Sequence, residues 1–283
     1  MTDVQKRAQQ RGIICVLTAA LLYSIGGLCI KLIPWNGMSI NSARNIISAT
    51  VVGFYLLLTH HKLRFNRFIG LGALCVSGTN ILYSLANKLT TAANAIVLQF
   101  TAPIFVILLS ILFWKRKPKK LDVIACLVVL AGVICFFIDG LEMGGMLGNG
   151  LALLSGLSYA GVFLLNDMPD GDPLCSIFWG FLVSVVAGFP FLVQETVFTT
   201  TAIVSVIALG ALQVGLAYIL MCIGLRTTPP VTASMITGIE PILNPIWVAI
   251  FYHEMIGPMA LIGAAIVIIT VIVYNVQKAK HPA

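Results

Sequence analysis

Long apolar segments separated by short polar loops run through the whole chain. Each segment approaches the roughly 20 residues that an α-helix needs to cross the hydrocarbon core of a bilayer. The pattern marks ten of them: Gly12–Ile33, Ser39–Thr59, Phe68–Asn87, Ala92–Trp114, Leu121–Ile138, Leu147–Leu165, Leu174–Val193, Ala202–Leu225, Val231–Tyr252 and Pro258–Val276. The loops are too short to hold a soluble domain. The sequence therefore predicts an all-α polytopic membrane protein with ten transmembrane helices.

Composition supports a helical membrane protein over other classes. Apolar residues make up 59% of the chain and charged residues only 10%, whereas soluble domains carry about 25% charged residues. A membrane β-barrel would alternate apolar and polar positions instead of keeping continuous apolar runs. The net charge of +7 comes from short loops, without the basic and aromatic clusters typical of nucleic-acid binding, so no nucleic-acid partner is expected.

Lys and Arg accumulate in the loops on one side of the predicted membrane. That side holds Lys6, Arg7, Arg11, Lys62, Arg64, Arg67, Lys115, Arg116, Lys117, Lys119, Lys120, Arg226, Lys278 and Lys280. Basic loops stay in the cytoplasm, so we expect a multi-pass protein of the plasma membrane with both termini cytoplasmic. The acidic loop Asn166–Pro173 is the one inward loop that does not fit, but acidic residues count little in this rule. The basic start resembles a signal peptide, yet it lacks a clear cleavage site and is interpreted as part of a first transmembrane helix.

The chain also repeats itself. Leu71–Phe136 aligns with Leu209–Tyr274 without a gap, and 16 of 66 positions are identical. The identities include a Leu-Gly-Ala-Leu match at the start and an aligned Pro-Ile pair at Pro103 and Pro241. We therefore expect two related halves, residues 1–140 and 141–283, of five helices each.

Five is an odd number, so the second half must enter the membrane in the opposite orientation. Inverted repeats of this kind are typical of secondary transporters, which bind substrate near the bilayer midplane where the repeats meet. The count of helices thus predicts two inverted five-helix repeats and a transport function.

The end of the second half adds a resemblance to a known family. From Ala233 the chain reads Glu240-Pro241-Ile242, then Trp247, His253-Glu254 and Gly263-Ala264. With ten helices in two five-helix halves, this pattern resembles the ten-helix EamA-type branch of the drug/metabolite transporter superfamily. The resemblance implies a basket in which helices three, four, eight and nine surround a central cavity and helices one and six act as gates. It also implies amino acids or related amines as the substrate class.

Two charged residues fall clearly inside the predicted membrane core, Arg44 and Glu240. A charge there costs at least about 2.5 kcal/mol, so each needs a partner or water. Glu240 is followed by Pro241 and Pro245, which remove backbone donors and loosen the helix. At about 1.5 Å per residue the two charges differ in depth by about 8 Å, so a structural ion pair and a snorkelling arginine both remain open. The functional alternative makes Glu240 a proton site or a ligand for an ammonium group. Arg44 would then bind a substrate carboxylate or neutralise Glu240 when the site is empty.

Other polar side chains gather on the third, fourth, eighth and ninth segments. The candidate substrate ligands are Asn80, Tyr83, Gln99, Tyr218, Thr237 and Asn244, with Tyr23 and Tyr159 from the first and sixth segments. Polar groups in a membrane often only hold helices together, and aromatic residues are common at membrane interfaces. Their concentration on aligned segments favours a shared cavity, and the aromatic residues, including Trp179 and Trp247, could form a cage for an amine.

No catalytic or cofactor motif appears. The seven cysteines are Cys15, Cys29, Cys75, Cys126, Cys135, Cys175 and Cys222, and without a Cys-x-x-Cys pair they are interpreted as small buried apolar residues and not as metal or disulfide sites. We find no nucleophile with a neighbouring base and no phosphate-binding loop, so no enzymatic activity, cofactor or metal is expected.

The sequence therefore predicts a secondary active or facilitative transporter that moves a small polar or amphipathic metabolite by alternating access, with protons as a candidate coupling ion. One alternative changes the substrate to an organic cation such as choline or a toxic amine. A second alternative is a membrane receptor or scaffold that transports nothing.

Overall fold

The computed structural model describes residues 3–90, 92–138, 145–252 and 257–280, and every regular element in these ranges is a helix. The first half contains α1 (Asp3–Ser24), α2 (Gly26–Lys31), α3 (Gly37–Leu58), α4 (Arg67–Leu89), α5 (Ala92–Gln99), α6 (Ala102–Trp114) and α7 (Lys120–Phe137). The second half contains α8 (Met146–Phe163), a 3₁₀ turn η2 (Leu165–Asp167), α9 (Pro173–Leu192), α10 (Thr200–Ala208), the π-helix η3 (Leu209–Leu216), α11 (Ala217–Leu225), α12 (Pro230–Ile236), the 3₁₀ turn η4 (Thr237–Ile239), α13 (Glu240–Tyr252) and α14 (Pro258–Lys280).

Within the described ranges these elements form ten consecutive runs, and five of the runs combine more than one element: α1 with α2, α5 with α6, α8 with η2, α10 with η3 and α11, and α12 with η4 and α13. Within the described ranges, five segments are long and apolar enough to cross a membrane: Arg67–Ala86, Ala95–Trp114, Met146–Phe163, Pro173–Leu192 and Thr200–Leu225. The predicted all-helical membrane fold is confirmed, whereas the full count of ten spans stays a prediction. The predicted boundary between the halves, at residues 140 and 141, lies outside the described residues.

Polar side chains start several helices. Asn36 accepts a hydrogen bond from the backbone of Met38 at 2.9 Å and begins α3, and Asn66 accepts two, at 2.9 and 2.8 Å, and begins α4. In the second half, Asp172 and Thr199 cap α9 and α10 in the same way. Such caps satisfy backbone N–H groups that have no partner inside the helix.

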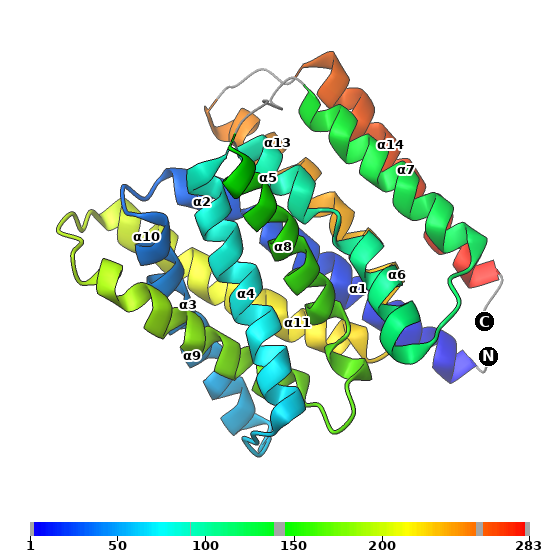
Figure 1. Cartoon of the computed structure of the whole chain (residues 1–283), viewed down its shortest axis with the longest axis horizontal. Helices are drawn as coiled ribbons and strands as arrows, with labels where there is room; N and C mark the ends of the chain where they lie inside the picture. The colour runs from blue at the N-terminus through cyan, green and yellow to red at the C-terminus, as the bar shows by residue number, and fades with distance from the viewer. Residues whose placement is uncertain (1–2, 91, 139–144, 253–256, 281–283) are drawn as a thin grey trace.

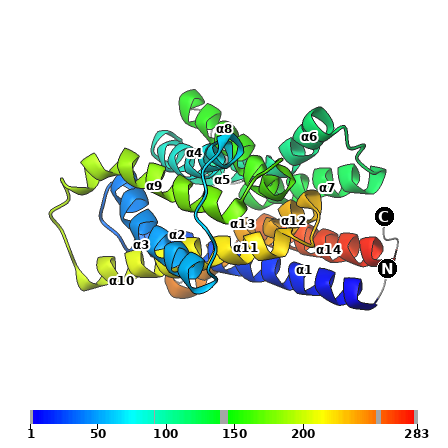
Figure 2. The ribbon, with the colours of Figure 1, turned by 90° about the horizontal axis from the view of Figure 1, so that it is seen from below.

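The two halves pack in a pattern that is symmetric under exchange of the repeats. Helix α4 packs on α8, as its counterpart α11 packs on α1, and α4 packs on α9, as η3 packs on α3. The pairs α3 with α9 and α7 with α14 each join two counterparts. Figure 2 shows α4 and α8 on the opposite side of the molecule from α1 and α11. The two-repeat arrangement is therefore visible in the packing as well as in the sequence.

The repeats run in opposite directions. Helix α7 leads away from the end of the bundle where α1 begins, and its counterpart α14 returns to that end (Figure 1). We call this end, where α1 begins and α14 ends, the terminal end of the bundle. The inversion predicted from an odd number of helices per repeat thus agrees with the direction of the helices.

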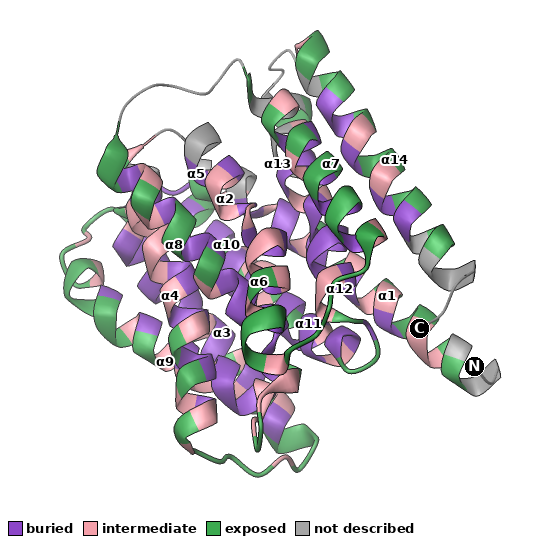
Figure 3. Cartoon of the chain, turned by 45° about the vertical axis from the view of Figure 1, so that its right-hand side comes forward, coloured by how far each residue is buried: buried purple, intermediate pink, exposed green. Residues whose placement is uncertain are grey.

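Residues on the outer faces of the helices are exposed and those on the inner faces are buried (Figure 3), and many of the exposed residues are large and apolar. On α6, Leu108, Leu112 and Phe113 are 52%, 70% and 68% exposed. Exposed apolar surface on this scale is unfavourable in water and is expected where lipid surrounds the protein.

Glycines allow the closest helix contacts. A Cβ atom on Gly188 of α9 would lie 2.5 Å from the Met38 carbonyl oxygen and 2.8 Å from the Ser42 Cβ atom of α3. Small residues at such crossings are what permits helix association in a membrane, where lipid competes equally for apolar surface. Gly150 of α8 is different, since a Cβ atom there would meet no atom within 4 Å.

This difference predicts opposite effects of the same substitution. Gly188→Ala should lower the melting temperature of the detergent-purified protein, because overpacking costs about 1–3 kcal/mol. Gly150→Ala should leave it unchanged or raise it, because Ala is favoured over Gly in a helix by up to about 1 kcal/mol. Equal melting temperatures for the two variants would contradict the close contact between α3 and α9.

Candidate functional site at the interface of the repeats

Two interrupted helices bring backbone breaks to matching positions in the repeats. Helix α5 ends at Gln99 and α6 begins at Ala102, while α12 ends at Ile236 and α13 begins at Glu240. The gapless alignment of the repeats places Ala102 on Glu240. Pro103 and Pro241 therefore each stand second in a new helix, where a missing N–H costs nothing. Because α12 packs against α6, both breaks lie where the repeats meet, as in the discontinuous helices of transporters.

The helix does not break at both prolines of the second repeat. The 3₁₀ turn η4 ends one residue before Glu240, whereas α13 runs without interruption through position 245. The sequence predicts that both Pro241 and Pro245 disturb the helix. The structure interrupts the helix just before Pro241 but not at Pro245.

Arg44 projects from α3 into the interface and is only 7% exposed. Its Nη2 atom donates to Asn41 Oδ1 at 3.1 Å and to Asn80 Oδ1 at 3.0 Å. Its Nε atom is buried and has no hydrogen-bond partner among the described residues. Arg44 therefore keeps an unused donor beside two neutral amides, where a carboxylate would be favourable.

Asn80 and its repeat counterpart Tyr218 contact each other. The same alignment places Asn80 of α4 on Tyr218 of α11, and their side chains are hydrogen bonded. Two equivalent positions touch only close to the pseudo-twofold axis that relates the repeats. Since that axis lies in the membrane plane for inverted repeats, this pair marks the middle of the bundle.

Three buried tyrosines continue the polar cluster. Tyr23, Tyr159 and Tyr218 come from α1, α8 and α11, and all three side chains are buried. The rings of Tyr23 and Tyr218 meet edge to face with centroids 5.6 Å apart. The Tyr159 hydroxyl bonds to Thr237 in the break of the second repeat. The Tyr23 hydroxyl is buried without a hydrogen-bond partner among the described residues.

Glu240 begins α13 beside these tyrosines. Its carboxylate is within electrostatic range of Tyr23, Tyr159 and Tyr218. The start of a helix favours a negative charge. Within the part of the chain that the structure describes, Glu240 forms no ion pair and no hydrogen bond of its side chain, and Arg44 is not its partner. The structural ion pair left open by the sequence is therefore not formed here.

Gln99 has a different environment. Its Nε2 atom donates to Ser155 Oγ at 2.7 Å, and Ser155 Oγ donates to the Thr79 carbonyl at 3.2 Å. These bonds join α5, α8 and α4 next to the break of the first repeat. Gln99 thus lies at the site but is already engaged in holding helices together.

The structure brings most of the predicted site residues into one group. Arg44, Asn80, Tyr83, Tyr218, Tyr23, Tyr159, Thr237 and Glu240 are linked by the contacts above or, for Tyr83, by its electrostatic proximity to Arg44. The side chain of Asn244 lies outside the described residues, as does Glu254 of the family-like pattern. Trp247 donates to Ser24 Oγ at 2.9 Å near the cluster. Trp179 donates to the Arg64 carbonyl at 3.1 Å at the terminal end of the bundle, so it does not belong to the group of buried tyrosines.

Several polar residues of this group were not among the predicted ligands. Asn41 and Asn45 hydrogen bond to each other at 3.0 Å on α3, and Gln213 lies in the π-helix with its Oε1 atom buried and unpartnered among the described residues. The spacing of Asn41, Arg44, Asn45 and Ser48 places all four on one helix face. That spacing could have identified Asn41 and Asn45 from the sequence. The π-helix that holds Gln213 is a type frequent at functional sites, but it has no sequence signature here.

Contacts join the two repeats at both ends of the bundle. At the terminal end, Arg116 forms a two-pronged pair with Asp167 at 2.6 and 3.1 Å, Asn66 donates to the Asp170 carbonyl at 2.7 Å, and His61 bonds to Asp172. At the opposite end, Trp35 donates to the Val197 carbonyl at 2.6 Å and the Asn36 backbone N–H donates to Glu195 at 2.8 Å. The acidic loop that did not fit the charge rule therefore serves as the partner of basic loops in the first repeat.

Asp172 is charged at neutral pH. Burial alone would raise the pKa of its carboxyl, but hydrogen bonds from the His61 side chain and from Cys175 outweigh that effect and lower the pKa below its ordinary value. The polar cluster thus lies between two sets of contacts that join the repeats.

Comparisons with known proteins agree with this architecture. A model of the EamA-like transporter family matches residues 10–138 and again residues 146–276. The "Uncharacterized transporter YwfM" of Bacillus subtilis (strain 168) is 26% identical over 221 residues, which cover 75% of this chain and 74% of that protein. A solved structure described only as "Crystal structure of protein" superposes with a TM-score of 0.82 at 17% identity, over 96% of this chain and 99% of that one, and supports the fold alone.

Proposed function

From the premise that the chain belongs to the EamA-like transporter family, we propose that it carries a small zwitterionic metabolite, an amino acid or a close relative, across the plasma membrane by alternating access. The observation that carries this proposal is that the guanidinium of Arg44 and the carboxyl group of Glu240 lie in one buried cluster without contacting each other. Arg44 offers a free Nε donor, and Glu240 is a carboxylate without a cationic partner among the described residues. A zwitterion supplies both missing groups.

The residues have separate roles in this proposal. The substrate carboxylate binds Arg44, which Asn41 and Asn80 orient. The substrate ammonium binds Glu240, and the faces of nearby tyrosines add attraction for a cation. The helix breaks next to Gln99 and Glu240 resemble those whose backbone groups bind polar atoms in secondary transporters.

Alternating access would open the two ends in turn. The contacts at the terminal end and at the opposite end join different loops of the two repeats, so a rocking motion of one repeat against the other separates one set while keeping the other. We place the terminal end in the cytoplasm, with both termini inside, because the basic loops gather there. Substrate or ion gradients supply the energy, and Glu240 is the proposed proton carrier if transport is coupled to protons.

A competition experiment tests the substrate class. The purified protein in liposomes should exchange a radiolabelled amino acid, and the unlabelled amino acid should compete at least about tenfold better than the amine that lacks its carboxylate, as expected for one lost charge-assisted interaction. Equal competition by the amine would overturn the role of Arg44 and favour an organic-cation carrier. Absence of exchange for every solute tested would overturn the proposal that the chain transports zwitterions.

A further inference from the structure

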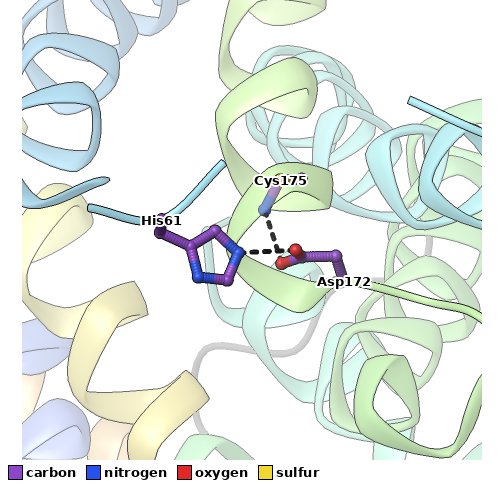
Figure 4. A group of neighbouring side chains, drawn as sticks. All are labelled: His61, Asp172 and Cys175. Atoms are coloured by element: carbon purple, nitrogen blue, oxygen red, sulfur yellow. Dashed lines mark hydrogen bonds and ion pairs between the residues drawn. The ribbon is translucent and has the colours of Figure 1, made fainter. Parts of the chain in front are cut away.

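Three metal-ligating side chains meet at the terminal end of the bundle, away from the polar cluster. His61 follows α3, whereas Asp172 and Cys175 begin α9 (Figure 4). The His61 Nε2 atom lies 2.5 Å from Asp172 Oδ2, and the imidazole nitrogen, carboxylate oxygen and thiol sulfur all lie within 4.8 Å of one another. His61 is 111 residues from Asp172 along the chain, which explains why no ligand spacing is visible in the sequence.

Local backbone geometry holds each ligand in place. At the end of α3, His60 adopts a left-handed conformation with φ of 50°, and the His61 N–H bonds to the Leu56 carbonyl at 2.9 Å. This is a common way to end a helix, and it turns the chain so that His61 reaches α9. Asp172 Oδ1 accepts the Cys175 N–H at 3.2 Å, so the carboxylate and the thiol lie in the first turn of one helix.

The three groups have the chemistry that zinc prefers. Zn²⁺ binds imidazole, carboxylate and thiolate ligands in a tetrahedron, and sites with three protein ligands leave the fourth position to solvent. Cys175 Sγ accepts the Arg64 N–H at 3.4 Å and donates to the Lys62 carbonyl at 3.7 Å, and a bound metal ion would replace the proton of the thiol. Cys175 is buried, whereas the His61 and Asp172 side chains are 31% and 14% exposed. An ion can therefore reach the group from the His61 side.

We propose that His61, Asp172 and Cys175 form a binding site for a divalent transition metal ion of the zinc class. The site joins the loop after α3 in the first repeat to the start of α9 in the second. An ion bound there fastens the two repeats at the terminal end, beside the Arg116–Asp167 pair. Its occupancy would therefore keep that end closed, a consequence that rests on the proposed transport function, whereas metal binding itself does not.

Titration of the purified full-length protein with ZnCl₂ tests the site. We expect one ion per chain, and His61→Ala and Cys175→Ser should each weaken binding by more than about 100-fold, since loss of even an indirect partner of a metal ligand costs about 10- to 100-fold. Two matched controls, His60→Asn and Cys135→Ser, remove a neighbouring histidine and a distant cysteine and should bind as the original protein does. Substoichiometric binding, or equal affinity in the ligand variants, would overturn the proposal.

Cobalt gives a second measurement that does not depend on affinity. Co²⁺ bound at this site should show the visible bands of a tetrahedral ion and a thiolate charge-transfer band that Cys175→Ser removes.

In liposomes, Zn²⁺ should slow solute exchange by the original protein but not by His61→Ala. Zinc binding without any solute exchange would count against the transport proposal alone, and solute exchange without zinc binding would count against the metal site alone.

Discussion

Uptake by reconstituted protein is expected to fall at least about tenfold when Glu240 is replaced by Gln. The substitution keeps the size of the side chain but removes the only carboxylate described in the polar cluster. A hydrogen bond to a charged group contributes about 1.5–3 kcal/mol, and each 1.4 kcal/mol corresponds to about a factor of ten. Initial rates in proteoliposomes at saturating and limiting solute separate a loss of affinity from a loss of turnover.

Asp170→Asn provides the matched control for this experiment. Asp170 is an exposed carboxylate in the loop before α9, and it adopts a left-handed conformation that Asn tolerates well. Its uptake rate should be unchanged. If Glu240→Gln transports at the original rate with the original pH dependence, Glu240 has no part in the mechanism.

Replacing Arg44 by Gln is expected to remove selectivity for the carboxylate of the substrate. The amino acid should lose about 10- to 150-fold in apparent affinity, the range of one charge-assisted hydrogen bond, while the matching amine should change little. Competition curves for both compounds in the same vesicles measure this difference directly.

Arg226 supplies the control arginine, since it is exposed at the end of α11. Arg226→Gln should leave both competition curves unchanged. An equal loss for the amino acid and the amine in Arg44→Gln would show that Arg44 only supports the fold through Asn41 and Asn80. That result would exclude it as a carboxylate ligand.

Much of the architecture follows from one-dimensional features of the chain. Apolar runs predict the helices because only helices satisfy their own backbone in lipid. An odd number of helices per repeat predicts the inversion without any knowledge of packing. The first helix begins earlier than predicted, at Asp3 instead of Gly12, because the basic residues before the apolar run continue the helix outside the predicted span.

The sequence predicted residues that the structure brings close together, but not the contacts between them, and their role in binding substrate stays a prediction. The estimated depths of the two residues in the membrane placed Arg44 within reach of Glu240. Depth does not say toward which neighbouring helix a side chain points, and Arg44 binds Asn80 instead. The contact between Asn80 and Tyr218 depends on how the repeats cross. The group of His61, Asp172 and Cys175 depends in the same way on two loops that only tertiary packing brings together.

Access of water to the interface of the repeats is the most direct test. Thr237 is completely buried in the break before Glu240, and in a protein whose native cysteines are replaced by Ser we would introduce Thr237→Cys. A charged, membrane-impermeant thiol reagent should modify this cysteine in active proteoliposomes, excess substrate should slow the reaction, and a cysteine at the lipid-facing Leu108 should not react. If Thr237→Cys is as unreactive as Leu108→Cys while transport continues, the polar cluster does not line the substrate pathway.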